Sequence, residues 1–543
     1  LEYTHKLFEN WNVPVFNGIG LYNQLKEDYL ETEEGLSPIT TLASVIFPEM
    51  DGFSDSLPLI GTEEVDITLS NAAHRVVQPC LFRRNVELMM KRIDKRVYLQ
   101  KKPKAKKRIA LMLLNYPPGE DNIGSAAYFD GLRSLINILD ELETDGYSVK
   151  IPEDCLYSDP GKLKDWLIQN GVVNLPRFNA LKDLIDSSRA NNNGEIRVAS
   201  VSSDQFKEWY HNKLPQGLRS DVEKAWGKFP GKIHVLGDEI YLPIVKFGNI
   251  FVGLQPSRGD IEDIEKSYHD ETLPPHYQYL AFYYFLQEEL DVDAIVHMGT
   301  HGTLEFLPGK EIGLHTDTCY NFSMIDDVPH FYIYQVSNTS EGMIAKRRSL
   351  STLVSYQTPA YTDTGLEKSF AEIEEKINLL EEARSMNNPS VRELETEIIE
   401  SANKKGITAD SVDEIADEVT KIKTSLIPDG LHEFGTGFNV EKTVEFIWNI
   451  QPMIPVHPNL YEIFGRYHNL SSDIIEDMGT WIRENSEDPL RDKIKDDAYT
   501  LITSIIRSEA SSEISQMVNL HPFLEPISGQ FNNLAEQIQK ISY

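Results

Sequence analysis

The chain has 543 residues, 41% of them hydrophobic, and this is more than one hydrophobic core usually supports, so two to four domains are expected. Its 85 acidic side chains outnumber 52 Lys and Arg, and the resulting net charge of −33 repels nucleic acid and anionic membrane surfaces as partners. Three scattered cysteines and the lack of a long apolar run favour a cytoplasmic protein without a disulfide framework. The chain starts without a methionine, so we expect it to be a fragment of something longer.

Residues 1–105 carry short apolar runs at Val13–Phe16 and Ser44–Gly52, and the second run ends in a proline and two carboxylates. We expect an α/β segment here. The stretch Arg83–Lys107 is rich in Lys and Arg, which is unusual in so acidic a chain. A solvated connector between domains is the simplest interpretation of that stretch.

The clearest strand follows Arg108, where six consecutive apolar residues end at an asparagine and two prolines. A loop of small residues then leads into a helix that we expect to end near Leu142. Further strands are expected at 233–236, 240–247, 250–259 and 330–336, with helical segments between them. This alternation predicts an α/β domain over residues 106–365, with mixed or parallel sheets flanked by helices.

Apolar residues between 366 and 425 recur at alternating spacings of four and three, which predicts charged amphipathic helices. We expect them to form a helical hairpin insertion over residues 366–430. Residues 431–543 are predicted to be mostly helical. The fold class is therefore a multidomain α/β protein with a helical insertion and a mostly helical C-terminal part.

Histidines, a carboxylate and a lysine gather between Asp293 and Lys310, starting at the apolar run Ala294–Val296 that predicts a buried strand. Gly299 and Gly302 free the backbone to turn and argue against a continuous helix. We therefore expect the strand to end in a loop, followed by a short helical turn. Polar groups at strand ends of α/β proteins commonly lie in the crevice where small molecules bind.

Three of these side chains, His297, His301 and Glu305, recur every four residues. Two neutral imidazoles and a carboxylate suit cobalt, nickel or zinc, so a metal site is one interpretation. In the other, the histidines hydrogen-bond loop backbone while Glu305 caps a helix or pairs with Lys310. The spacing leaves both interpretations open.

Other polar groups follow expected strands or turns. Gln255 and Arg258 lie at the end of the strand expected at 250–259, and His269 and His276 belong to a turn region that leads into an aromatic helix. The basic run Lys346–Arg348 suits either a solvated helix face or a clamp for anions.

The sequence excludes two common enzyme motifs. Lys310 lacks both the upstream glycine and the following Ser or Thr of the phosphate loop G-x₄-G-K-[ST]. No G-x-S-x-G nucleophile elbow is present either. If the function needs ATP, another chain hydrolyses it.

Several segments, in their order along the chain, resemble the large subunit of the ATP-dependent tetrapyrrole chelatases, the cobaltochelatase CobN and magnesium-chelatase H-subunit family. The segments that carry the resemblance are Phe47–Gly52, Asn115–Pro118, Gln255–Gly259, Tyr268–Asp270, Leu273–His276, His297–Lys310, Glu341–Gly342 and Ala345–Arg348. Members of this family are about twice as long as this chain, so we expect it to be a central fragment.

The resemblance implies a ligase that forms nitrogen–metal bonds. Its large subunit binds a tetrapyrrole or corrin macrocycle, while AAA+ ATPase and von Willebrand-type partner subunits hydrolyse ATP-Mg. The Leu-Pro-Gly-Lys and Ala-Lys-Arg-Arg segments look like the cobalt branch, which inserts Co²⁺ into hydrogenobyrinic acid a,c-diamide. Thr300 and Phe306 depart from that branch, which leaves insertion of Mg²⁺ into protoporphyrin IX open.

The resemblance also suggests roles for individual residues. Glu305, His297 and His301 would hold the metal transiently and remove pyrrole protons. The remaining candidates would bind or support the macrocycle: Asn115, Tyr116, Gln255, Arg258, His269, His276, Lys310, Arg347 and Arg348. Two rival functions are a tetrapyrrole carrier or sensor that exchanges no metal and, more weakly, a metal-dependent hydrolase built on the same three residues.

Overall fold

The computed structural model describes most of the chain and divides it into two compact units. The described ranges are 13–69, 72–115, 122–174, 178–191, 197–259, 272–300, 302–359, 361–363, 368–385, 390–405, 426–428, 430–451, 459–485 and 488–507, with a few single positions besides. The first unit comprises residues 1–358 and 432–435, and the second comprises residues 359–431 and 436–543.

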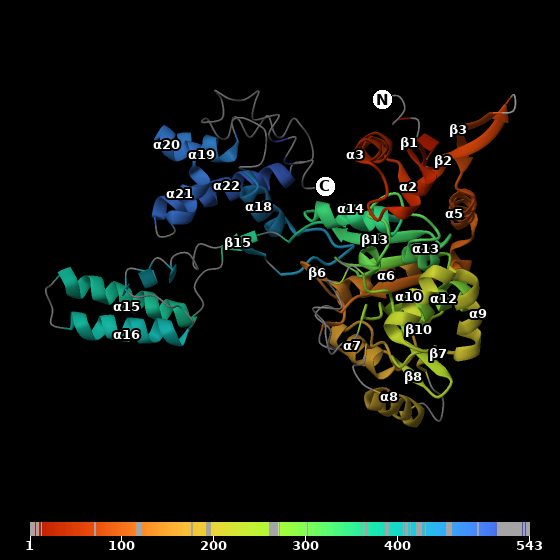
Figure 1. The fold of residues 1–543 in the computed structure, drawn as a ribbon. Coiled ribbons are helices and arrows are strands. Elements are labelled where there is room, and N and C mark those ends of the chain that lie inside the picture. The colour runs from red at the N-terminus through yellow and green to blue at the C-terminus, as the bar shows by residue number, and fades with distance from the viewer. Residues whose placement is uncertain are drawn as a thin grey trace. The chain divides into compact units, whose positions relative to one another are not determined.

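The first unit is built on a six-stranded sheet, two of whose strands, β10 and β13, are labelled in Figure 1. Its strand order is β10–β11–β4–β12–β13–β14. All neighbours pair in parallel except β10, which lies antiparallel to β11 at the edge. Strands β4 and β11 are buried at every position, as expected for parallel strands with helices on both faces. The strands are β4 (Ile109–Leu113), β10 (Ile244–Phe247), β11 (Ile250–Leu254), β12 (Ala294–Met298), β13 (His330–Gln335) and β14 (Ser351–Tyr356).

Helices cover both faces of this sheet. On one face, Leu111 and Val252 belong to a core shared with α6 (Gly131–Thr144) and α7 (Pro160–Gln169). On the other face, Met112 and Phe251 belong to a core shared with α9 (Ser203–Lys213), α10 (Gln216–Trp226), α12 (Tyr277–Tyr284) and α13 (Tyr320–Ile325). The result is a three-layer α/β/α arrangement, which confirms the predicted α/β fold class.

Helix α12 is the element that carries polar groups into the interior. Its N-terminus is capped by His276, whose ring accepts a hydrogen bond from the backbone N–H of Tyr279, and it follows two prolines. All eight residues of α12 are buried, and a π-helical turn at Phe285–Glu289 extends it towards β12. The hydroxyl groups of Tyr279 and Tyr283 are thereby placed against the sheet, where they need partners.

The N-terminal part forms a three-stranded sheet of β1 (Phe16–Leu25), β2 (Ser54–Leu69) and β3 (Ala72–Leu81). The β1–β2 pair is parallel and the β2–β3 pair is antiparallel. The helical segments around this sheet are α2 (Lys26–Glu31), α3 (Pro38–Thr41), the π-helix η1 (Leu42–Ile46), α4 (Phe47–Met50) and α5 (Arg83–Lys101).

The basic stretch that follows Arg83 is for the most part helix α5, and most of its cations are exposed or half-buried, but Arg92 departs from the expected solvated connector. Arg92 of α5 is only 1% exposed, and its Nε donates to Asp55 Oδ2 over 2.7 Å. Its other nitrogens donate to the carbonyls of Asp326 and Leu350. Farther on, Lys102 forms an ion pair of 2.7 Å with Asp293, the residue before β12. Charge density in the sequence did not reveal that these cations fix the helix to the sheet.

Shorter elements complete the first unit. They are η2 (Lys104–Lys106), β5 (Ser125–Ala126), β6 (Phe129–Asp130), α8 (Phe178–Asn191), β7 (Ala199–Ser202), β8 (Val235–Leu236), β9 (Glu239–Leu242), η6 (Leu304–Phe306) and α14 (Thr339–Arg348). Strands β7, β9 and β8 form a small antiparallel sheet.

The second unit is mostly helical. Helices α15 (Lys368–Ser385) and α16 (Val391–Lys404) form the predicted hairpin around a core that includes Leu380 and Ile398. The rest comprises β15 (Tyr361–Asp363), β16 (Leu426–Pro428), α18 (Val440–Asn449), α19 (Leu460–Tyr467), α20 (Ser472–Glu476), α21 (Met478–Glu484) and α22 (Pro489–Arg507). The helical insertion and the helical C-terminal part are confirmed, while the four domain boundaries stay a prediction. Within the described ranges, the chain contains no helix with the length and apolar character needed to cross a bilayer.

The buried Arg92–Asp55 pair leads to a stability prediction. The change Arg92→Leu leaves the Asp55 carboxylate, itself 1% exposed, without its cation in the interior. We expect the free energy of unfolding to fall by about 3–5 kcal/mol, the usual cost of breaking a buried ion pair from one side. Urea denaturation of both proteins measures the difference. The control is Arg75→Leu, which removes an ion pair on exposed β3 and should change little; equal stability of wild type and Arg92→Leu would contradict the argument.

Candidate active site

The candidate site lies where β4, β11 and β12 end, at the carboxyl edge of the parallel strands. β12 leaves the sheet at Gly299, whose φ of +92° is in the left-handed region. A Cβ on Gly299 would lie 2.4 Å from the Cβ of Ala126, so a side chain there would force the neighbouring backbone apart. Asn115 follows β4, and Asn174 joins it to β11 by donating to Asn115 Oδ1 (3.0 Å) and to the carbonyl of Gln255 (2.8 Å).

His297 stands in β12 and is held by hydrogen bonds at both ring nitrogens. His330 Nδ1 lies 2.8 Å from the carbonyl of Ser349, to which it can only donate, so its Nε2 is an acceptor. His297 Nδ1, 2.6 Å away, therefore donates to His330 Nε2. This leaves His297 Nε2 as an acceptor, and it receives the hydroxyl proton of Tyr283 over 3.1 Å.

Burial keeps both imidazoles neutral, as this assignment of donors and acceptors requires. Burial lowers the pKa of His330 from 6.5 to about 3. Burial, followed by the proximity of His330, also lowers the pKa of His297 well below its ordinary value.

Gln255 extends the same chain of hydrogen bonds to the loop after β12. Its Nε2 donates to the hydroxyl oxygen of Tyr283 at 2.7 Å. Its Oε1 accepts from the backbone N–H and the hydroxyl of Thr303, at 2.8 and 3.1 Å. Since the Thr303 hydroxyl donates to Gln255, it accepts from Tyr279, 2.9 Å away. One directional network thus joins β11, α12, β12, β13 and the loop.

Glu305 lies in the 3₁₀ turn η6 and is completely buried. Its Oε1 accepts from the backbone N–H of Gly302 (3.3 Å) and from the hydroxyl of Tyr332 (3.1 Å). A Cβ on Gly302 would lie 2.5 Å from that hydroxyl, so the close approach needs glycine. Burial, and then the carboxylate of Glu305, raise the pKa of Tyr332 well above 10, so Tyr332 remains a proton donor to Glu305.

Comparisons with known proteins identify the family. The profile of the CobN/Magnesium Chelatase family matches residues 2–540 of the chain. The chain belongs to this family.

Proteins similar to this chain include subunits named for different metals. An uncharacterised protein of Methanocaldococcus jannaschii is 31% identical over 490 residues, covering 84% of this chain. The chloroplastic magnesium-chelatase subunit ChlH of Oryza sativa subsp. indica is 27% identical over 83% of the chain, and the aerobic cobaltochelatase subunit CobN of Sinorhizobium sp is 29% identical over 61%.

A solved structure, the catalytic subunit of cobaltochelatase from Mycobacterium tuberculosis, has the same fold. It superposes with a TM-score of 0.71 at 22% identity over 97% of this chain. The chain spans only 25–42% of the lengths of these four proteins.

Three of the predicted site residues lie outside the part of the chain that the structure describes: Tyr116, His269 and His301. The trio of His297, His301 and Glu305 is therefore seen only in part. Among the residues that the structure does describe, no group of three His, Cys, Asp or Glu side chains is arranged to hold a metal ion.

Two further candidates lie at the end of β11 and before α12. His276 is buried, and its Nε2 donates to the carbonyl of Ser257 over 2.7 Å while its Nδ1 caps α12. Burial lowers the pKa of His276 to about 3, so this ring is neutral as well. Arg258 is 1% exposed and donates to the carbonyl of Asp270.

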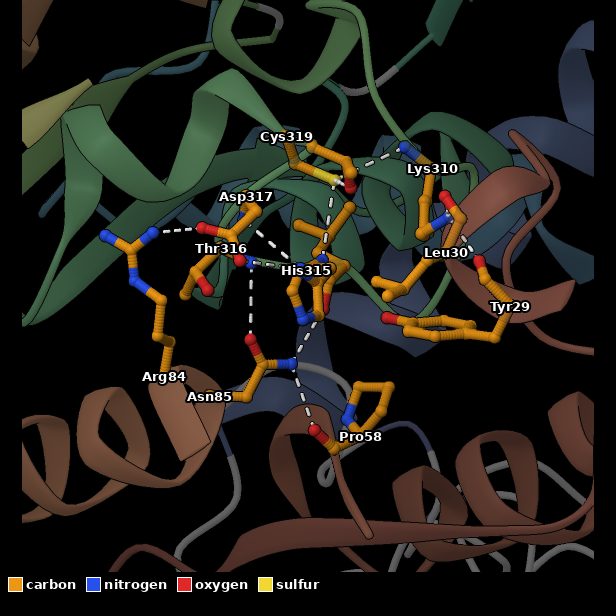
Figure 2. Close-up of polar contacts among 12 residues, drawn as sticks. Tyr29, Leu30, Pro58, Arg84, Asn85, Lys310, His315, Thr316, Asp317 and Cys319 are labelled. Carbon is orange, nitrogen blue, oxygen red and sulfur yellow. Dashed lines mark hydrogen bonds and ion pairs between the residues drawn. The ribbon is translucent and has the colours of Figure 1, made fainter. Parts of the chain in front are cut away.

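The remaining candidates are cations that the protein uses internally. Lys310 Nζ donates to the carbonyls of Tyr29, Leu30 and Thr32 at the end of α2 (Figure 2). Arg347 forms a bidentate ion pair with Glu49, with its shortest distance at 2.7 Å. Arg348 donates to three carbonyls of the loop that begins at Glu305. This geometry favours roles other than the substrate contacts that the resemblance suggested.

The sequence-based reasoning missed Tyr283, His330, Tyr332 and Thr303, all of which contact the predicted residues. A signal was present: His330, Tyr332 and Tyr334 alternate along one strand, and Tyr279 and Tyr283 are four apart on one helix. Polar side-chain groups that recur on a buried face indicate a buried hydrogen-bond network, but the sequence does not say which donor contacts which acceptor.

The neutral histidines predict acid sensitivity. Unfolded histidines bind protons near pH 6.5, whereas folded His330 and His276 do so only near pH 3. Between these values the unfolded state binds more protons, so the free energy of unfolding falls as the pH falls, by up to about 1.4 kcal/mol per pH unit for each histidine. Urea denaturation at pH 7.5, 6.0 and 5.0 measures this slope.

The matched variants are His330→Gln, which should flatten the slope, and His211→Gln on the exposed face of α9, which should leave it unchanged. A slope that is the same in wild type and His330→Gln would show that His330 is not the group that takes up the proton.

Proposed function

We propose that this chain is part of the large, tetrapyrrole-binding subunit of an ATP-dependent metal chelatase. The observation that carries the proposal is Glu305, a completely buried carboxylate in the turn η6, which follows β12 along the chain. This carboxylate accepts hydrogen bonds from the backbone N–H of Gly302 and from the hydroxyl of Tyr332. The chain that contains it belongs to the CobN/Magnesium Chelatase family. Insertion of a metal requires a base for two pyrrole protons and ligands that release the cation again, and a carboxylate can serve both needs.

The hydrogen-bond network refines the roles within this site. His297 was expected to bind the metal, but its Nε2 accepts from Tyr283 and its Nδ1 donates to His330. We therefore assign His297 to positioning, because it orients Tyr283 and, through it, Gln255. Glu305 and His301 remain the proposed transient metal ligands and proton acceptors.

Macrocycle binding is proposed for the edge of the sheet at which β4 and β11 end. Asn115 and Arg258 follow these strands, and Tyr116 and His269 are close to them in sequence. Ligands of open α/β sheets bind at such an edge, and amide, phenol and guanidinium groups suit the carboxylate and amide substituents of a tetrapyrrole.

The proposed metal substrate is Co²⁺ and the proposed macrocycle is hydrogenobyrinic acid a,c-diamide. The Leu-Pro-Gly-Lys and Ala-Lys-Arg-Arg segments support the cobalt branch. Mg²⁺ with protoporphyrin IX is the alternative, since a magnesium-chelatase subunit is similar at nearly the same identity as a cobaltochelatase subunit.

Hydrolysis of ATP-Mg is proposed for AAA+ and von Willebrand-type partner subunits, because Lys310 caps α2 and is not part of a phosphate loop. The three cysteines are unpaired thiols, which fits a reducing, cytoplasmic setting.

A reconstitution experiment separates these possibilities. The full-length protein is titrated with metal-free hydrogenobyrinic acid a,c-diamide and with protoporphyrin IX, and binding is followed by fluorescence quenching. Partner subunits, ATP and then Co²⁺ or Mg²⁺ are added, and insertion is read from the absorption spectrum. Insertion that depends on ATP and partners is expected. Binding without insertion would instead indicate a carrier or sensor, and hydrolysis without partners a hydrolase.

The role of Glu305 gives a direct prediction. The change Glu305→Gln keeps the size of the side chain but removes the charge and the proton acceptor, so metal insertion should fall by about 10²–10⁴-fold. The affinity for the macrocycle should stay within about twofold, because the variant preserves the shape of the site. Insertion kinetics and fluorescence titration measure the two quantities. Unchanged insertion by Glu305→Gln would remove Glu305 from the reaction.

A further inference from the structure

Three carbonyls of the loop from Glu305 to Lys310 accept hydrogen bonds from one guanidinium, that of Arg348 at the end of α14. Arg348 Nε donates to the carbonyl of Glu305 and Nη1 donates to the carbonyl of Lys310, both over 2.6 Å. Nη2 donates to the carbonyl of Leu307. These carbonyls belong to three different residues of a segment with little regular structure, so no helix or sheet ladder satisfies them together.

The chemistry of arginine explains why this residue type stands here. A guanidinium presents five N–H groups in one rigid plane, so it can reach three diverging carbonyls at once. A lysine ammonium is a compact point charge on a flexible stem and does not impose this planar arrangement. The cation also lies in the last turn of α14, where the helix dipole favours positive charge.

The far end of the loop is fixed by two further contacts. Gly309 has a φ of +141°, and a Cβ there would lie 2.9 Å from the Sγ of Cys319. Cys319 Sγ in turn accepts from the backbone N–H of Lys310 (3.3 Å), and the Lys310 side chain inserts among the carbonyls that end α2 (Figure 2). With this end anchored, the Glu305 end is held by Arg348 and by Asn321, whose Nδ2 donates to the neighbouring carbonyl of Leu304 over 2.6 Å.

We propose that Arg348 is a positioning residue for Glu305, an inference that rests on the proposed function of Glu305. The carboxylate of Glu305 contacts Gly302 N–H and Tyr332, and these contacts require its main chain to stay in place. The hydrogen bond from Arg348 Nε to the carbonyl of Glu305 provides that restraint. Arg348 acts on Glu305 through the main chain of the loop, because its nitrogens donate to backbone carbonyls there.

A test combines two variants with two kinds of measurement in the full-length protein. Arg348→Met removes the guanidinium but keeps an apolar stem, and Arg348→Lys keeps only the charge. Hydrogen exchange of peptides that cover residues 302–311 reports on the loop without any reaction. Steady-state metal insertion with partner subunits and ATP then reports kcat and the KM for the macrocycle.

We expect amide exchange in residues 302–311 to rise by about tenfold or more in Arg348→Met, because the loop opens locally without its anchor. The kcat should fall by about 10²-fold, the scale of a 1 Å misplacement, with KM within about twofold. Arg348→Lys should fully restore neither the wild-type rate of amide exchange nor the wild-type kcat. The control Arg75→Met, on exposed β3, should change neither.

Three outcomes would overturn the inference: unchanged exchange in Arg348→Met, full restoration by Arg348→Lys, or a KM that rises more than about tenfold at unchanged kcat. The last result would instead make Arg348 a ligand of the macrocycle. A wild-type protein that inserts no metal would refute the proposed function alone, since the exchange measurement still decides whether Arg348 holds the loop.

Discussion

The structure of the site depends on one constraint, which is that polar groups buried in the sheet must find partners. His297 stands in the middle of a covered parallel strand, where water does not satisfy its ring. Its partners are His330 on the next strand and Tyr283 on α12. Each neutral ring in the series has one donor and one acceptor, so the carbonyl of Ser349 sets the direction of the hydrogen bonds from His330 to Tyr283, and the amide of Gln255 and the backbone N–H of Thr303 continue it.

This network has a consequence for chemistry. A metal at His297 Nε2 would have to displace the hydroxyl of Tyr283, whose proton would then lose its acceptor in the interior, and this is costly. The network therefore keeps His297 neutral and hydrogen-bonded at both ring nitrogens, and the proposed role in metal insertion falls to Glu305.

Cations have an unexpected role in this acidic chain. Arg92, Lys310 and Arg348 all direct their nitrogens to main-chain carbonyls of segments far away in sequence. Loops that lack a ladder of backbone hydrogen bonds leave their carbonyls in need of donors, and arginine and lysine supply several donors each. The lysine of the Leu-Pro-Gly-Lys segment and the last arginine of the Ala-Lys-Arg-Arg segment hold the same loop, the lysine at its last residue and the arginine at three of its carbonyls.

The sequence by itself determined the α/β class, the strands β4, β11, β12 and β13, the helical hairpin and the segment that carries the site, because these follow from local periodicity and from glycine and proline positions. It also pointed to Glu305 and His297 as neighbours of a strand end. The tertiary structure alone decided that His330 and Tyr283 hydrogen-bond the two ring nitrogens of His297, and that Arg348 donates to the carbonyl of Glu305. Those contacts join residues 14 to 43 positions apart, and no local pattern encodes which distant donor meets which acceptor.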